Sequence, residues 1–434
     1  MLYIDNILFA IILIAGIGFF AQNVKKLKRN INLGRDVNRT DNSSARWKNM
    51  TMIALGQSKM VKRPIAAFLH LIVYVGFIII NLEVLEIIID GLFGTHRVFS
   101  KMGSFYGFLI GSFEVLAVLV LVAVAAFWIR RNVLSIGRFR STDLNGAPKK
   151  DANTILYFEV VLMSLFLIMN AFDLHFQDMN SGNIISQFLA PSPDTFSLEA
   201  VTIIERTAWW LHIVGILIFL NYLYYSKHLH ILLAFPNTYF ADLNAKGKFD
   251  NLESVTKEVK LMMDPNADPF AAQPVDENAV PSKFGASDVQ DLNWVQLLNA
   301  YTCTECGRCT SSCPANQTGK KLSPRKIMMD TRDRMVELGD YKRKNGADTE
   351  DGKSLLGNYI TEEELWACTS CNACVQECPV NIDPLSIIMD LRRFLVMEES
   401  KVPTELTGML TNIENNGAPW QFAPTERMNW ANED

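Results

Sequence analysis

The stretch YTCTECGRCTSSCPAN, residues 301–316, carries four cysteines in the spacing C-x-x-C-x-x-C-x-x-x-C-P. This spacing is typical of a site where thiolates hold an iron–sulfur cluster. The same chain begins with the apolar run LFAIILIAGIGFF, residues 8–20, whose composition suits a lipid bilayer. The sequence therefore predicts a membrane part and a cluster-binding part in one polypeptide.

The cysteine motif is repeated. A second copy, ELWACTSCNACVQECPVNIDP, residues 364–384, has the same spacing and the same Cys-Pro ending, and the two copies contain all eight cysteines of the chain. In two-cluster ferredoxins of this type, the fourth cysteine of each run binds the other cluster. We therefore expect two 4Fe–4S clusters with crossed ligands. The expected ligand sets are Cys303, Cys306, Cys309 with Cys378, and Cys368, Cys371, Cys374 with Cys313.

The first 235 residues contain five apolar stretches that are long enough, or nearly so, to cross a bilayer as helices. We place these spans at residues 4–23, 64–89, 105–129, 155–172 and 207–225. The spacer and the end of the cluster region carry apolar residues at intervals of three to four, which favours helices there too. The predicted fold class is mainly α, with a five-helix transmembrane bundle followed by an α-helical ferredoxin domain.

The charges between the spans predict an orientation. Residues 25–63 and 130–150 are rich in lysine and arginine, whereas the connection 173–205 is acidic. The positive-inside rule places the basic loops and the cluster domain in the cytoplasm and the N-terminus outside the inner membrane. The first span lacks a basic leading segment, so we interpret it as a retained anchor and not as a secretion signal.

Zinc and disulfides are the alternatives for the cysteines. Zinc sites use paired C-x-x-C units and seldom repeat a four-cysteine run that ends in proline. Disulfides conflict with a cytoplasmic location, where thiols stay reduced. Both alternatives are weaker than two iron–sulfur clusters.

All six histidines lie in the apolar half. His70 falls inside the second span, and His212 and His230 are 18 residues apart, which is about five turns on one continuous helix. On such a helix the two rings share one face near opposite membrane surfaces, while His228 points elsewhere. Neutral imidazole inside a bundle suits axial ligation of haem iron. The alternative is structural histidines that form hydrogen bonds between helices.

Acidic residues lie near the outer ends of two spans, at Glu83, Glu86 and Glu114. They could relay protons to or from a quinone. The alternative is that they lie in the headgroup zone and have little role. Because all three are near a span end, the second interpretation is the stronger one from sequence alone.

Composition changes along the chain predict four regions. Residues 1–235 form the membrane domain and residues 236–292 a linker on the cytoplasmic face, with one short helical pattern. Residues 293–400 form the cluster domain, and residues 401–434 form a tail suited to subunit docking. The net charge of −5 argues against a general nucleic-acid binder.

The run LHIVGILIFLNYLYYSKHLHI, residues 211–231, resembles the fifth helix of the respiratory nitrate reductase gamma-subunit family. That resemblance implies b-type haem in the membrane part. By position, it pairs His230 with His70 around an inner haem and assigns His212 to an outer one. The partner position of His212 falls at Ile80, which cannot bind iron, so a second haem is left open. His175 is the other histidine that could take this place.

The chain as a whole resembles membrane-associated heterodisulfide-reductase-like iron–sulfur oxidoreductases. Its last stretch, NNGAPWQFAPTERMNW at residues 415–430, is similar to the segment that leads into a cysteine-rich catalytic domain in longer members. All eight cysteines here are assigned to clusters, and no CCG motif occurs. The resemblance therefore implies that a cysteine-rich, CCG-type catalytic domain is a separate polypeptide.

These inferences combine into one functional hypothesis. The chain is expected to be an electron-transfer subunit, non-catalytic or reactive only with quinone, that links menaquinone or another quinone to a cytoplasmic redox partner through haem b and two clusters. The alternative is a haem-free, membrane-anchored ferredoxin that serves a flavoprotein dehydrogenase.

Overall fold

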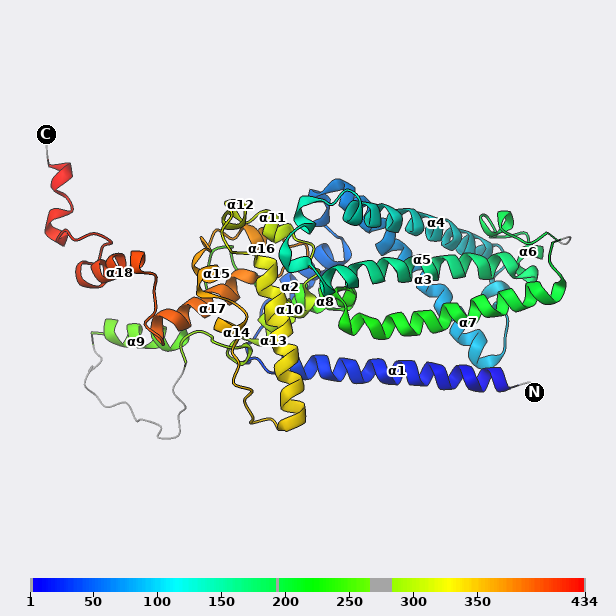
Figure 1. Ribbon diagram of the computed structural model, residues 1–434, viewed down its shortest axis with the longest axis horizontal. Helices are drawn as coiled ribbons and strands as arrows, with labels where there is room; N and C mark the ends of the chain where they lie inside the picture. Colours follow the sequence, from blue (N-terminus) through cyan, green and yellow to red (C-terminus); the bar gives the residue numbers. More distant parts are fainter. Residues whose placement is uncertain (1–2, 193–194, 266–282, 433–434) are drawn as a thin grey trace.

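The computed structural model describes residues 3–192, 195–265 and 283–432. The chain is 70% helical and forms no β-strand within these ranges. A membrane-type bundle and a smaller helical domain lie end to end along the long axis of the molecule (Figure 1). The predicted fold class, a mainly α chain with five membrane helices before a helical domain, is confirmed.

Five long helices form the bundle, and each is long and apolar enough to cross a membrane. Their apolar faces meet in one core, in which α5 packs against both α4 and α7. Many outward-facing side chains are large and hydrophobic, as expected for surfaces in contact with lipid. The helices are α1 (Ile4–Ile31), α3 (Pro64–Phe93), α4 (Ser104–Asn132), α5 (Ala147–Phe172) and α7 (Leu198–Tyr222).

Helix α1 continues through the basic run that follows its apolar part. The sequence predicted an end at residue 23, but the helix ends at Ile31. Lysine and arginine are good helix formers, so the helix continues where the apolar run stops. This extension carries Leu27 and Asn30 into the cluster domain, where both are buried.

The fifth membrane helix does not reach His230. Helix α7 ends at Tyr222, a short 3₁₀ turn follows, and Ser226 adopts an extended conformation before His230 begins α8 (His230–Tyr239). The prediction that His212 and His230 share one face of a continuous helix is therefore wrong. The extended backbone at Ser226 changes the direction of the chain. The spacing of apolar residues in the sequence does not reveal such a change.

The cluster domain consists of short helices around one long helix, α13. Its core also contains Leu229 and Leu233, which belong to the segment that follows the fifth span. The packed core thus joins the cluster domain to the end of the membrane bundle. Its helices are α10 (Trp294–Thr302), α11 (Arg308–Ser311), α12 (Pro314–Gln317), α13 (Pro324–Asn345), α14 (Leu355–Asn358), α15 (Glu362–Trp366), α16 (Ala373–Glu377) and α17 (Pro384–Met397).

Buried polar contacts hold the two domains together. Arg325 is fully buried and donates to the Asp143 carboxylate at 2.7 and 3.0 Å and to the carbonyl of Arg138 at 3.1 Å. The Asn30 side-chain amide donates to the Tyr301 hydroxyl at 2.8 Å. These bonds join residues far apart in sequence and fix how the domains dock.

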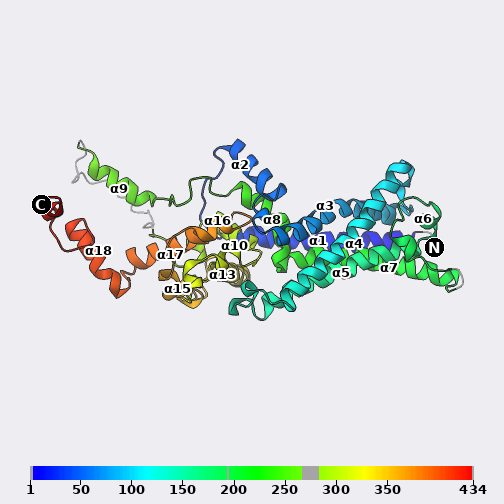
Figure 2. The ribbon, with the colours of Figure 1, turned by 90° about the horizontal axis from the view of Figure 1, so that it is seen from above.

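The remaining helices lie at the periphery. Helix α9 coincides with the helical pattern expected in the linker, and neither it nor α18 contains a buried residue. Both lie on the side of the cluster domain away from the bundle (Figures 1 and 2). Within the predicted linker, residues 266–282 lie outside the described residues. The peripheral helices are α2 (Ser43–Met50), α6 (Leu174–Asp178), α9 (Glu253–Met263) and α18 (Thr404–Asn416).

The buried Arg325–Asp143 pair yields a test of domain docking. We expect Arg325→Met to destabilise the cluster domain by about 3 kcal/mol, because the substitution leaves a buried carboxylate without its partner. The measurement is the urea concentration at which the visible absorption of the clusters is lost. Lys321→Met, which breaks an exposed pair with Glu363, is the matched control and should leave this midpoint unchanged. Equal midpoints for both variants would contradict a structural role of the buried pair.

Candidate cluster and haem sites

The two cysteine motifs have the same backbone shape. In the first, Glu305 and Gly307 flank the second cysteine with φ of 52° and 72°. In the second, Ser370 and Asn372 occupy the same positions with φ of 56° and 59°. Left-handed residues on both sides of Cys306 and Cys371 bend each loop into a turn that gathers its cysteines. The repeat seen in sequence is thus a repeat in structure.

The loops face each other because α11 packs against α16. Burial and the neighbouring Cys306 raise the pKa of the Cys378 thiol to about 11, and Cys378 is among the groups that raise the pKa of Cys309 beyond the effect of burial. Burial also raises the pKa of Cys368, with a contribution from Cys313. Such effects require short separations. Cys378 therefore lies near Cys306 and Cys309 of the first run, and Cys313 lies near Cys368 and Cys374 of the second.

The thiols do not converge on single points. No group of three or more histidine, cysteine or acidic side chains in the described ranges has the close geometry of a single metal ion. A 4Fe–4S cluster needs a wider arrangement, since each thiolate binds a different iron atom. Backbone amides already donate to two of the sulfurs, from Ile382 to Cys378 at 3.2 Å and from Ser370 to Cys368 at 3.4 Å. Such bonds stabilise cluster thiolates.

A buried ionic network anchors the first cluster loop to the membrane domain. Glu305, between Cys303 and Cys306, pairs with Lys227 and accepts from Arg332 at 2.9 Å. Burial opposes the charge on Glu305, but the two cations outweigh burial and hold the pKa of this carboxyl below its ordinary value. Because Lys227 lies just after the fifth span, the loop is fixed to the end of the bundle.

Three histidines gather at this same end. The ring centroids of His70 and His230 are 6.5 Å apart, and those of His228 and His230 are 5.4 Å apart. Two imidazoles that bind one iron from opposite sides, each through a bond of about 2 Å, have centroids about 6 Å apart. The separation of His70 and His230 therefore fits a bis-histidine haem.

The orientation of His230 also suits a ligand. Its Nδ1 lies 2.9 Å from the carbonyl oxygen of Lys227. A backbone bond of this kind leaves Nε2 free for a metal and fixes the ring. Arg308, inside the first cysteine motif, is in electrostatic range of His70 and donates to the carbonyl of Lys59 at 3.1 Å. The histidine pair and the first motif are therefore neighbours at the junction of the domains.

His228 is the residue that sequence reasoning assigned elsewhere. The 3₁₀ turn over Lys227–Leu229 brings its ring beside that of His230, and its buried Nδ1 has no hydrogen-bond partner in the described part of the chain. The signal in the sequence is the spacing H-x-H. On a regular helix this spacing separates the two rings, whereas the break at Ser226 brings them together.

His212 lies apart from the other histidines. It is 2% exposed, its ring packs against Phe166 at 6.2 Å, and its buried Nδ1 has no hydrogen-bond partner among the described residues. His175 lies on the surface of the far end of the bundle, and its ring meets that of His96 edge-on, with centroids 5.5 Å apart. The structure thus brings His70 and His230 together and leaves His212 without a histidine partner among the residues described.

The acidic residues expected in the headgroup zone are buried instead. Glu83, Glu86 and Glu114 are 3%, 3% and 0% exposed. Glu86 accepts from the Tyr106 hydroxyl at 2.9 Å, and Glu114 accepts from the amides of Ile185 and Ser186. Their burial was not anticipated from the sequence: the loop after α3 and the segment after α6 fold over them and provide hydrogen-bond partners for Glu86 and Glu114.

The cysteine-rich region is similar to a known family of iron–sulfur domains. Residues 302–382 match the family described as the 4Fe-4S dicluster domain. This range contains all eight cysteines, so the cluster domain is an iron–sulfur domain.

Relatives extend the similarity to the membrane part. The chain is 28% identical to the probable iron-sulfur-binding oxidoreductase FadF of Bacillus subtilis, over 99% of this chain and 61% of that protein. It is 24% identical to an EtfAB:quinone oxidoreductase of Syntrophomonas wolfei, over 92% of this chain and 55% of the relative. A probable membrane-anchored ferredoxin of Chromohalobacter salexigens is 32% identical over 36% of this chain and 25% of its own length.

The chain thus spans little more than half the length of the two relatives that match nearly all of it. Other relatives are subunits of heterodisulfide reductases, matched over about a third of this chain or less. No solved structure matches. Together these relatives are iron–sulfur proteins of oxidoreductase and electron-transfer systems, and five apolar helices make this chain a membrane protein.

The crossed arrangement of the thiols can be tested with pairs of substitutions. If Cys306 and Cys378 serve one cluster, Cys306→Ala/Cys378→Ala should keep about half of the bound iron, since the other cluster is intact. Cys306→Ala/Cys313→Ala should lose nearly all of it, because each change then removes a ligand from a different cluster. Iron content and the electron paramagnetic resonance signal of the reduced protein measure the result. The reverse pattern would mean that each motif holds its own cluster.

Proposed function

We propose that this chain is a membrane electron-transfer subunit that passes electrons between the quinone pool and a cytoplasmic redox partner, through haem b and two 4Fe–4S clusters. The observation that carries the proposal is the junction of the two domains. There, His70 and His230 face each other at 6.5 Å beside the loop that holds Cys303, Cys306 and Cys309. A haem at this point supplies one-electron redox chemistry next to the first cluster.

The residues of the chain have distinct roles in this proposal. His70 and His230 would hold the haem iron, and the carbonyl of Lys227 orients the second of them. The two crossed sets of four cysteines hold the clusters. Glu305 positions the first cluster loop against the bundle through Lys227.

The membrane end and the partner follow from chemistry and similarity. The name of one relative pairs EtfAB with quinone, which supports quinone as the reactant on the membrane side. We assign menaquinone or another quinone to this role. On the soluble side we assign a cysteine-rich, CCG-type catalytic unit or a flavoprotein as the partner. The basic loops support a cytoplasmic cluster domain and an N-terminus on the outer side.

We assign a separate role to each of four regions of the chain. Residues 1–235 are the haem domain, 236–292 the linker, 293–400 the cluster domain and 401–434 the docking tail. The tail helix α18 has exposed apolar side chains, among them Met409, Leu410 and Ile413, which suits contact with another subunit.

A haem-free, membrane-anchored ferredoxin remains the second candidate, favoured by the similarity to a protein of that description. In that case His70 and His230 only pack together. The first discriminating measurement is the absorption spectrum of the purified, dithionite-reduced protein. Absence of a b-type α band would contradict the haem proposal and favour this second candidate.

Substitution of a single histidine gives the matching genetic test. We expect His70→Ala to abolish the b-type α band and to slow the reduction of the clusters by quinol at least about 100-fold, because one of the two residues that would hold the haem is removed. His175→Ala, which removes an exposed ring at the other end of the bundle, is the control and should keep the full band. An unchanged spectrum in His70→Ala would rule out this residue as a ligand.

A further inference from the structure

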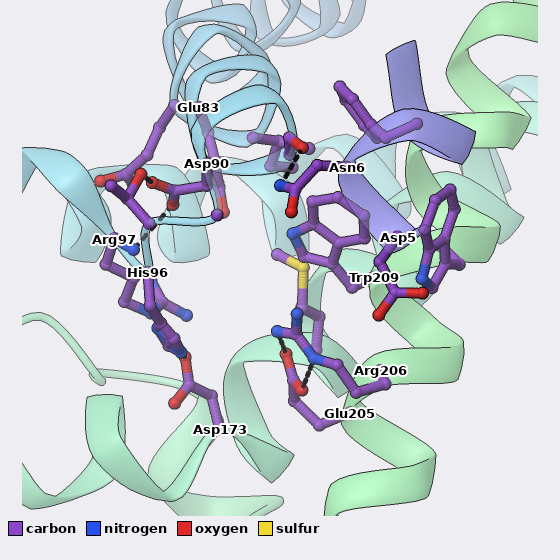
Figure 3. Close-up of a pocket in the computed structure, with 18 residues that line it drawn as sticks. Asp5, Asn6, Glu83, Asp90, His96, Arg97, Asp173, Glu205, Arg206 and Trp209 are labelled. Carbon is purple, nitrogen blue, oxygen red and sulfur yellow. Dashed lines mark hydrogen bonds and ion pairs between the residues drawn. The ribbon is translucent and has the colours of Figure 1, made fainter. Parts of the chain in front are cut away.

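A cavity lies at the distal end of the bundle, meaning the end away from the cluster domain. Its volume is about 360 Å³, and helices α1, α3 and α7 form it together with the loop after α3 (Figure 3). This size falls within the range of small-molecule sites, about 300–1,000 Å³. None of the residues assigned to the haem or the clusters lines it.

The walls of the cavity differ in character. One side is aromatic: Phe9 and Trp209 have ring centroids 5.5 Å apart, and Trp209 and Trp210 are 5.2 Å apart. The opposite side is polar and carries Glu83 and Arg97, which Figure 3 shows across the space from Trp209. A flat ring with polar atoms at its edges matches such a combination, since aromatic walls stack on its face and polar groups bind its edge.

Glu83 is the unusual group in this cavity. It is 3% exposed, and its Oε2 has no hydrogen-bond partner among the described residues. Its neighbours are satisfied: Glu86 accepts from the amide of Phe99 at 2.8 Å, and Asp173 accepts from Arg97 at 2.6 Å. A buried carboxyl oxygen without a partner is costly inside a membrane protein and marks a place where a ligand or a proton is bound.

The cavity lies close to His212 along helix α7. Glu205, which lines it, precedes His212 by seven residues on α7, and seven residues are about two turns. The two side chains therefore lie on the same face, about 10 Å apart along the helix axis. The cavity opens beyond His212, on the side away from the cluster domain.

We propose that this cavity binds the ring of a quinone, with the ring against Phe9 and Trp209 and one of its oxygen atoms on Glu83. The inference rests on the proposed function, in which quinone is the membrane reactant, and it adds the place of binding. The naphthoquinone or benzoquinone class fits because both are flat, apolar rings with oxygen atoms on opposite edges.

Proton balance gives Glu83 its role. Oxidation of a quinol to a quinone breaks two O–H bonds and releases two electrons and two protons. The Glu83 carboxylate accepts the proton of the hydroxyl that faces it, and the second proton leaves through the cavity mouth, where His96 pairs with Asp173 at 3.3 Å. The haem and clusters of the proposed function accept the two electrons. In quinone reduction, the same groups deliver the protons.

Two measurements on the purified full chain test the site. The first is binding of 2-heptyl-4-hydroxyquinoline N-oxide, a redox-inert quinol analogue, followed by quenching of its fluorescence. The second is the rate at which menadiol reduces the clusters. We expect Glu83→Gln to weaken binding of the N-oxide about 10-fold, since the hydrogen bond of the Glu83 carboxyl to the analogue is lost, and to slow reduction by menadiol by at least as much.

Two further variants make the test specific. Thr95→Trp, at an exposed position on the cavity rim, should block binding without touching Glu83. Glu159→Gln removes a carboxyl on α5 that does not line the cavity and is the matched control, with wild-type binding expected. Iron content and thermal midpoint verify that every variant is folded.

The outcomes separate the inference from the proposed function. If menadiol reduces the wild type while Glu83→Gln and Thr95→Trp both bind the N-oxide normally, the cavity holds only water, and the inference is overturned while the proposed function stands. If the wild type neither binds the N-oxide nor accepts electrons from menadiol, both are overturned. Weaker binding in the two cavity variants with normal binding in Glu159→Gln supports the site.

Discussion

The buried ion pair between Lys227 and Glu305 is the contact on which the arrangement of the redox groups depends. The Lys227 side chain holds the first cysteine loop, and its main chain does two further things: its amide donates to Asp151 at 3.2 Å, and its carbonyl contacts the Nδ1 of His230. One residue thus ties a cluster loop, a membrane helix and a histidine ring together. Arg332 forms a second ion pair with Glu305. The two cations keep the Glu305 carboxylate ionised despite its burial.

The polar groups of the membrane domain gather at its two ends. The histidine trio lies at the junction with the cluster domain, and the carboxylates around Glu83 lie at the distal end. Between them the bundle core is built from apolar side chains, apart from His212. Since isolated polar groups are costly in lipid, their grouping into two sites agrees with the two roles that we propose, electron transfer at one end and quinone binding at the other.

Local patterns in the sequence predicted much of this architecture. Hydropathy found the five membrane helices, and cysteine spacing found the iron–sulfur domain. Prediction from the sequence failed at two places where the local pattern is misleading. Periodicity treated residues 212–230 as one helix, because an extended Ser226 leaves no trace in hydropathy. Position near a span end suggested that Glu83 lies in the headgroup zone with little role, because the sequence does not show that protein encloses it.

The sequence by itself determined which chemistry the chain can support: thiolates in two matched runs, imidazoles in an apolar half, and helices long enough to cross a bilayer. These features depend on residue type and on short spacing, which the covalent chain specifies. Only the tertiary structure decided which of these groups meet. His70 and His230 are 160 residues apart and meet through packing within the membrane domain, whereas Lys227 and Glu305, 78 apart, meet because the two domains dock. Long-range packing sets those distances, and no local pattern encodes it.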